Sequence, residues 1–317
     1  MDRLQLRIDE MENPTCLGID PSPEVVPDFL FQKGKELYKK DINCALEYAI
    51  YEFGRRLINS TADIVPAVKP QLAFYESYGT AGMKALEKTM LYAQDRGMLV
   101  VADAKRGDIG STCEAYARAF LGETTIADLK FRAFPADIIT VQPYTGWDGI
   151  KPFLDAVCEY KAGIFLLCRT SNPSAKDLQD LELSDGRAVV QILAELITKW
   201  GQSSVSEKYI LSALGAVVAA TYPEEARRLR AIMPHTFFLV PGYGAQGAGA
   251  ADAVAGFRAD GSGAIVSASR SIATAYKKFD YPPEKFEQAA RAETIEMREK
   301  LNKALNHRQT KEEKWQV

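Results

Sequence analysis

The sequence is poor in the residues on which several classes of protein depend. It contains only two histidines in 317 residues, and its cysteines are scattered, odd in number and without a C-x-x-C pair. The five are Cys16, Cys44, Cys113, Cys158 and Cys168. This pattern is typical of reduced thiols and not of a disulfide framework or a zinc site. Because His235 and His307 lie away from the expected site, we do not expect histidine-based acid–base or zinc chemistry.

The chain also lacks an excess of positive charge and any long apolar run. Its net charge of −3 argues against nucleic acid as the main partner, since binding to a phosphate backbone needs a basic face. No segment reaches the roughly 18 apolar residues of a membrane span. Residues 1–14 contain no apolar core of a signal peptide. We therefore expect a cytoplasmic protein with neither a membrane nor a nucleic-acid partner.

Short apolar runs of β type alternate with longer amphipathic segments along the chain. Several runs are nearly continuous in Val, Ile and Leu, as in parallel strands that are covered by helices. The expected strands are 16–20, 64–70, 98–105, 137–143, 163–171, 215–221, 237–242 and 263–269. Eight strands, each followed by a helical segment, predict an α/β fold of the (β/α)8 or TIM-barrel type. A doubly wound open sheet is the alternative.

The same pattern predicts how the chain is divided. We expect residues 1–281 to form the barrel. Residues 282–317 are expected to form a C-terminal helical extension of the same domain, packed on the barrel or on a second subunit. Segment 172–208 is long for a connection between a strand and its helix, so an insertion is expected before that helix.

Charged residues gather where the third expected strand ends, in VVADAKRGDIGST (100–112). The active site of a (β/α)8 barrel lies at the C-terminal ends of its strands. Asp103 and Lys105 are two apart and should share a face, and the barrel interior is favoured because a charged pair against the helix layer would be costly. Lys69 ends the neighbouring strand, and Asp108 follows in the loop before a helix.

Each of these residues also has a purely structural interpretation. Asp108 could cap a helix, Asp103 and Lys105 could be an ion pair that closes the barrel, and Lys69 could be solvated at a strand end. Their joint placement favours a polarised cluster in a cleft. Arg106 falls on the opposite face and is left out of the chemistry.

A glycine-rich loop, LVPGYGAQG (239–247), follows the seventh expected strand. It matches G-x-G-x-x-G, but a dinucleotide fingerprint belongs in the first βα unit, with an acid about 20 residues further on. Barrels often bind phosphate with the loops after strands 7 and 8. Gln246 can donate from its amide and Arg270 supplies a charged fork. The plain alternative is a glycine turn with a surface arginine.

Residues 103–112 have the form D-x-K-x-x-D-I-x-x-T, which resembles the longer prokaryotic branch of the orotidine 5′-phosphate decarboxylase family. Further matching motifs follow in the family's order over roughly residues 10–280. They are LGIDPSPE, VKPQLAFYESYG, LLCRTSNPSAKDLQDL, GAVVAATYPEEARRLR, LVPGYGAQGA and SASRSI. The resemblance implies a TIM-barrel lyase that needs no metal or other cofactor and converts orotidine 5′-monophosphate to UMP and CO₂ in pyrimidine biosynthesis.

The resemblance also implies a role for each candidate residue. Lys105 would give a proton to C6 of the pyrimidine within a charged tetrad, and the protein would be a homodimer. The tetrad would be Lys69, Asp103, Lys105 and Asp108, and the residues contributed to the partner's site would be Asp108, Ile109 and Thr112. Ribose hydroxyls would contact Asp20, Lys69 and Thr112, the pyrimidine edge would contact Ser171, and the phosphate would contact Pro241, Gln246 and Arg270.

Three other functions share parts of this pattern. A Schiff-base aldolase also uses a barrel lysine but needs it neutral, whereas carboxylates on both sides favour the ammonium form. A metal-dependent sugar-phosphate decarboxylase or synthase has the same D-x-K-x-x-D core, although two nearby lysines oppose a divalent cation. A non-catalytic nucleotide-binding protein has no need for Lys105 between two acids.

Overall fold

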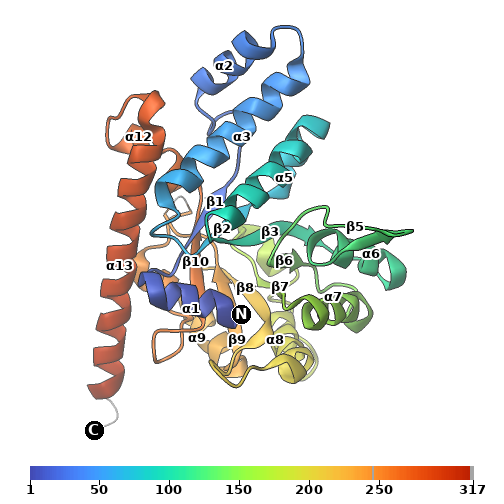
Figure 1. Ribbon diagram of the computed structural model, residues 1–317. Coiled ribbons are helices and arrows are strands. Elements are labelled where there is room, and N and C mark those ends of the chain that lie inside the picture. Colours follow the sequence, from blue (N-terminus) through green and yellow to red (C-terminus); the bar gives the residue numbers. More distant parts are fainter. Residues whose placement is uncertain (245, 315–317) are drawn as a thin grey trace.

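The computed structural model describes residues 1–244 and 246–314, and eight parallel strands in it close into a barrel (Figure 1). The barrel strands are β1 (Thr15–Ile19), β2 (Ala67–Pro70), β3 (Leu99–Arg106), β6 (Ile138–Val141), β7 (Gly163–Arg169), β8 (Ser212–Val218), β9 (Thr236–Val240) and β10 (Ala264–Ala268). Because β10 pairs with β1, the sheet has no free edge. Each strand overlaps an expected run, so the (β/α)8 prediction is confirmed and the open-sheet alternative is wrong.

Two layers of apolar side chains explain why these segments form strands. Alternate strand residues such as Leu17 and Val68 face the helices, while Cys16, Ala67, Phe165 and others fill the barrel interior. Helix α1 (Asp2–Met11) adds apolar side chains to the interior cluster and closes the N-terminal end of the barrel. Polar side chains inside the barrel are therefore expected at its C-terminal end.

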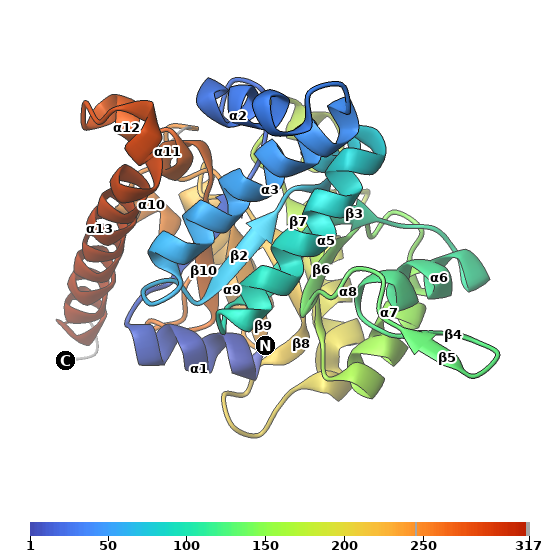
Figure 2. The same ribbon diagram turned by 45° about the horizontal axis from the view of Figure 1, so that its top comes forward.

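Helices surround the barrel on its outer face (Figure 2). They are α2 (Asp28–Tyr38), α3 (Ile42–Thr61), α4 (Leu72–Glu76), α5 (Gly79–Asp95), α6 (Gly110–Phe120), α7 (Trp147–Tyr160), α8 (Val189–Gly201), α9 (Pro223–Ile232), α10 (Ala250–Ala253), α11 (Arg270–Ala273) and α12 (Ala275–Lys278). The expected insertion before α8 is present. It holds a 3-10 turn, Pro173–Asp177, followed by irregular chain.

A small antiparallel hairpin, β4 (Thr124–Ile126) and β5 (Leu129–Phe131), projects from the body beyond α6 (Figure 2). The sequence analysis did not predict it. Its two-residue turn contains Ala127 at a φ of 53°, a left-handed conformation that usually calls for Gly or Asn. The turn therefore carries no recognisable hairpin sequence.

The C-terminal helix α13 (Phe286–Lys314) packs along α3 of the same chain (Figure 1). Phe286 stacks on Phe53 with ring centroids 5.5 Å apart, and Arg291 forms an ion pair with Asp63 at 2.6 Å. The extension was expected to pack on the barrel or on a second subunit. In the described residues it packs on the barrel of its own chain. Within the same part of the chain, no helix is both long and apolar enough to cross a membrane.

Candidate active site

The carboxylate of Asp103 is the centre of a charged cluster at the C-terminal end of the barrel. Its Oδ2 pairs with Nζ of Lys69 at 2.6 Å, and its Oδ1 pairs with Nζ of Lys105, also at 2.6 Å. The side chains of Asp103 and Lys69 are both 9% exposed, whereas that of Lys105 is 41% exposed. One lysine is thus buried as a fixed counter-charge, and the other presents its ammonium to the open end.

Two uncharged side chains complete the surroundings of Asp103. Gln71 donates from Nε2 to Oδ2 at 2.9 Å, and the Thr140 hydroxyl donates to Oδ1 at 3.0 Å. Each carboxylate oxygen therefore accepts two hydrogen bonds. The sequence analysis missed both residues, although Gln71 lies two after Lys69 and Thr140 is the polar residue of the buried run Ile138–Val141.

The charges of this cluster are held in their ionised forms. Burial alone would raise the pKa of Asp103, but the ammonium groups of Lys69 and Lys105 outweigh it and hold that pKa well below its usual range. Burial would likewise lower the pKa of Lys69, but the carboxylates of Asp103 and Asp20 outweigh it and raise that pKa. A neutral lysine at this position is therefore disfavoured.

The backbone at Lys105 departs from ordinary strand geometry. Its φ is 47°, in the left-handed region, and the register between β3 and β6 shifts between Ala102 and Arg106. The amide of Lys105 donates to Thr140 Oγ1 at 2.9 Å, which helps to hold this conformation. The expectation that Asp103 and Lys105 converge is met, but the simple alternation invoked for it is interrupted. Such conformations of non-glycine residues are often found at functional sites.

Asp20 follows β1 and faces the same charges. Its carboxylate contributes to the raised pKa of Lys69. Its Oδ1 is buried and accepts no hydrogen bond from the described part of the protein. A buried acceptor of this kind is available to a hydroxyl of a ligand.

The three residues at the start of α6 lie apart from this cluster within one chain. Asp108 accepts a hydrogen bond from the Ile109 amide at 2.7 Å, and it forms no ion pair among the described residues. Ile109, rather than Asp108, is the N-cap of α6, so the capping interpretation of Asp108 is wrong. Ile109 is 57% exposed, and Thr112 is also exposed. A single chain thus brings together three members of the predicted tetrad and leaves Asp108 outside.

The loops after β9 and β10 form the second candidate region. Gly242, Gly244 and Gly247 have φ values of 103°, 72° and 94°, which other residues rarely adopt. Gln246 is exposed, and its Oε1 lies 3.1 Å from where a Cβ on Gly242 would be. Pro241 directly follows β9, and the exposed Arg270 begins α11. Ala245 of this loop lies outside the described residues.

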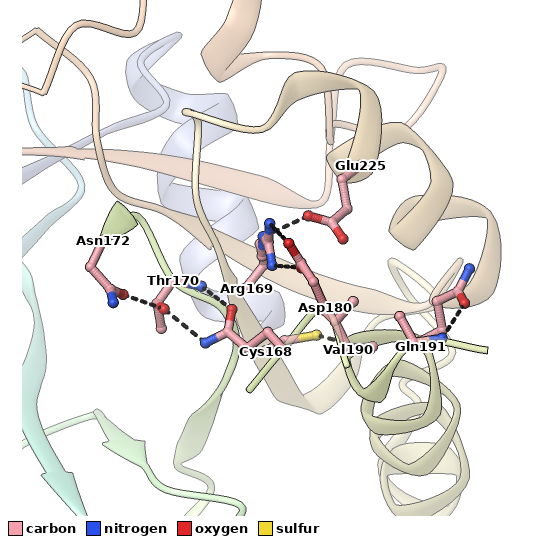
Figure 3. A network of polar contacts seen from close by, with 10 residues as sticks. Cys168, Arg169, Thr170, Asn172, Asp180, Val190, Gln191 and Glu225 are labelled. Carbon is pink, nitrogen blue, oxygen red and sulfur yellow. Dashed lines mark hydrogen bonds and ion pairs between the residues drawn. The ribbon is translucent and has the colours of Figure 1, made fainter. Parts of the chain in front are cut away.

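Ser171 lies two residues beyond β7 and is half-buried. Its neighbour Thr170 donates to Asn172 Oδ1 at 2.6 Å and accepts from Gln179 Nε2 at 2.8 Å (Figure 3). These bonds hold the chain on both sides of Ser171 at the end of the barrel strand.

Residues that the sequence analysis excluded from the chemistry have other partners. Arg106 pairs with Glu76, and its guanidinium lies over the ring of Tyr116 at 5.7 Å. Burial raises the pKa of Cys16 and of Cys168 to about 12, which disfavours a thiolate nucleophile. Within residues 1–244 and 246–314, no three His, Cys, Asp or Glu side chains are grouped to hold a metal ion.

Comparisons with known proteins find similarity over most of this chain. A model of the family described as "Orotidine 5'-phosphate decarboxylase / HUMPS family" matches residues 16–279. The chain is similar to the orotidine 5′-phosphate decarboxylase of Caldicellulosiruptor bescii, with 38% identity over 305 residues that cover 96% of this chain and 98% of that protein. It is also similar to the enzyme of that name from Rhodopirellula baltica, with 41% identity over 292 residues, covering 90% and 93% of the two chains.

A solved structure gives the same result in three dimensions. The OMP decarboxylase of Leishmania donovani superposes with a TM-score of 0.69 at 31% identity, covering 94% of this chain and 97% of that one. The range matched by the family model begins within β1 and ends beyond β10, so the similarity includes every strand end described above.

Proposed function

Because this chain belongs to the orotidine 5′-phosphate decarboxylase / HUMPS family, we propose that it converts orotidine 5′-monophosphate to UMP and CO₂. We propose further that Lys105 gives the proton to C6 of the pyrimidine, and that the reaction serves pyrimidine biosynthesis. One observation carries the mechanism. Asp103 is paired with two lysines, of which Lys69 is buried and Lys105 is exposed to the open end of the barrel.

The chemistry requires such an arrangement. Loss of CO₂ breaks the bond between C6 and the carboxyl carbon and leaves an electron pair on C6, where the ring offers little delocalisation. Fixed charges that are already oriented can stabilise this pair without reorganising. The Lys105 ammonium stabilises it and transfers a proton to C6, and the resulting amine takes up a proton from water before the next turnover. Asp103 keeps the Lys105 ammonium in place, with 2.6 Å between Oδ1 and Nζ.

The remaining candidate residues bind the nucleotide away from the reacting carbon. Asp20 and Lys69, with Thr112, hold ribose hydroxyls, and the unpaired Oδ1 of Asp20 supports this role. Ser171 contacts the pyrimidine edge. The phosphate contacts Pro241, Gln246 and Arg270, supported by the glycine-rich loop beside them. Binding energy from the phosphate can lower the barrier by holding the ring in its reactive orientation.

The proposal includes a homodimer in which Asp108, Ile109 and Thr112 complete the partner's site. The exposure of Ile109 and Thr112 and the absence of an ion pair to Asp108 among the described residues support this arrangement. With Asp108 supplied by the partner, Lys105 would lie between two carboxylates.

We propose one domain, in which residues 282–317 extend the barrel formed by residues 1–281. The packing of Phe286 on Phe53 supports this division. A cytoplasmic location is supported by the cysteines, all five of which are free thiols, as in a reducing compartment.

The direct test is an ultraviolet assay of UMP formation from orotidine 5′-monophosphate. Wild type is expected to be active with and without EDTA, and Lys105→Ala is expected to lose about 10⁴-fold in kcat, because both charge stabilisation and the proton donor are lost. Lys151→Ala is the matched control, since Lys151 forms only a surface pair with Asp155. Absence of UMP with wild type would refute the proposal. Activity lost with EDTA and restored by Mg²⁺ would favour the metal-dependent alternative.

A further inference from the structure

The segment 170–188, between β7 and α8, has little structure of its own although it begins beside the site. It holds one 3-10 turn, Pro173–Asp177, and one isolated bridge between Glu182 and Ala188. Ala175 is its only buried residue. A segment of this kind keeps a fixed position only through contacts with the rest of the protein.

Arg169, the last residue of β7, provides such a contact from outside the barrel. Its side chain is only 4% exposed, which is unusual for arginine. The guanidinium forms ion pairs with Asp180 and with Glu225, the latter with 2.6 Å between Nε and Oε2 (Figure 3). It also lies 3.9 Å above the ring of Tyr222. The buried charge is therefore paired on two sides and covered on a third.

The partners of Arg169 belong to different parts of the fold. Tyr222 and Glu225 lie at the start of α9, so they hold the guanidinium against the barrel wall. Asp180 belongs to the segment 170–188, and its side chain is 44% exposed. Arg169 is therefore the fixed group, and Asp180 is the point at which the segment attaches to it.

A second contact, beside the first, fixes how the end of β7 lies against residues 179 and 180. The Gln179 side chain accepts from the Thr170 amide at 3.1 Å and donates to the Thr170 hydroxyl at 2.8 Å. Adjacent residues 179 and 180 are thus bound to adjacent residues 170 and 169. The chain between them, residues 171–178, forms a closed loop, and Ser171 is its first residue.

We propose that Arg169 is a positioning residue, which holds Ser171 at the barrel mouth by anchoring Asp180. The inference rests on the proposed function, in which Ser171 contacts the pyrimidine. Asp180 and Arg169 touch no reacting atom and act only through the segment between them. Loosening this anchor weakens nucleotide binding more than it slows the chemical step, because the Ser171 contact is made in the bound substrate as well as in the transition state.

The test compares Asp180→Asn with Asp177→Asn in the full-length protein. Both variants remove one negative charge from the same segment, but the side chain of Asp177 forms no ion pair or hydrogen bond among the described residues. For Asp180→Asn we expect KM for orotidine 5′-monophosphate to rise about tenfold while kcat changes less than about threefold. Trypsin is expected to cleave faster after the exposed Lys176 and Arg187 in this variant only. Asp180→Glu, which keeps the ion pair, is expected to restore most of both properties.

Each other outcome is decisive. Equal KM values and equal cleavage rates in Asp180→Asn and Asp177→Asn would overturn the proposal. Faster cleavage with an unchanged KM would also overturn it, because the segment would then be loosened without effect on the site. Failure of wild type to decarboxylate would overturn the proposed function instead, and the cleavage rates would still decide whether Asp180 anchors the segment.

Discussion

Two ion clusters at the C-terminal end of the barrel, on β3 and β7, have opposite composition. At the end of β3, one carboxylate, Asp103, is held by two lysines inside the mouth. At the end of β7, one guanidinium, Arg169, is held by two carboxylates on the outer side. In the first, the side chain of Lys105 is 41% exposed, and in the second, the side chain of Asp180 is 44% exposed.

Under the proposed function, the cluster at β3 serves the chemistry and the cluster at β7 serves positioning. The two neighbouring lysines lower the pKa of Asp103, so its carboxylate stays ionised. Around Arg169, burial raises the pKa of Glu225, and the nearby Asp180 adds to this effect while Arg169 opposes it. The cluster at β3 presents the ammonium group of Lys105 toward the open mouth. The cluster at β7 presents only a point of attachment.

Asp103→Asn removes the carboxylate at the centre of the β3 cluster. We expect it to have the largest effect, on both the free energy of unfolding and kcat. It leaves Lys69 buried without a paired charge, and this should cost about 3 kcal/mol in the free energy of unfolding. The value of kcat should fall about 10³-fold, because Lys105 loses the group that orients it. Urea unfolding and steady-state kinetics measure the two effects. A variant with near-wild-type kcat would show that Asp103 is only structural.

A smaller effect, on a different quantity, is expected from Arg169→Met, which removes the centre of the β7 cluster. Methionine fills part of the space but leaves Glu225 partly buried without its cation, at a cost of about 2 kcal/mol in the free energy of unfolding. KM should rise while kcat falls less than about threefold. A loss in kcat as large as that of Asp103→Asn would erase the proposed difference between the clusters.

The smallest effect is a difference in pH dependence. The lowered pKa of Asp103 gives stability that is present above its unfolded pKa of about 3.9 and is lost as the pH falls below it. The raised pKa of Glu225 has the opposite sign, so its environment favours folding more as the pH falls through that pKa. The raised pKa of Lys69 gives stability that is present below about 10.4 and lost above it.

Unfolding free energies of wild type, Asp103→Asn and Glu225→Gln, measured between pH 3 and 9, check the signs given for Asp103 and Glu225. The free energy of unfolding of wild type minus that of Asp103→Asn should be constant from about pH 5 to 9 and decrease in acid. The same difference for Glu225→Gln should increase in acid. Parallel curves for the two variants would contradict the contrast drawn between the clusters.

The barrel could be predicted from the sequence because its strands are continuous Val, Ile and Leu runs, and such runs demand cover on both faces. The convergence of Lys69, Asp103 and Lys105 followed from strand ends and a family motif. Thr140 could not be recognised as a partner of Asp103, because the pairing depends on the register between β3 and β6, which shifts at this point.

Other features depend on contacts that no local pattern encodes. The left-handed backbone of Lys105 is compatible with the sequence but not required by it. The pairing of Arg169 with Asp180 and Glu225 joins three segments of the chain, and no regular spacing in the sequence predicts it. The hairpin of β4 and β5 was missed because Ala127 occupies its turn. Tertiary contacts, and not local sequence patterns, determine these features.

Exchange of the C6 hydrogen of UMP in D₂O tests the role of Lys105 most directly, because it isolates proton transfer from the loss of CO₂. By microscopic reversibility, the group that protonates C6 must also remove that proton. Loss of the H6 signal of UMP by NMR should be catalysed by wild type and not by Lys105→Ala, with Lys151→Ala as the control that behaves as wild type. Exchange by Lys105→Ala at the wild-type rate would contradict the assignment of Lys105 as the proton donor.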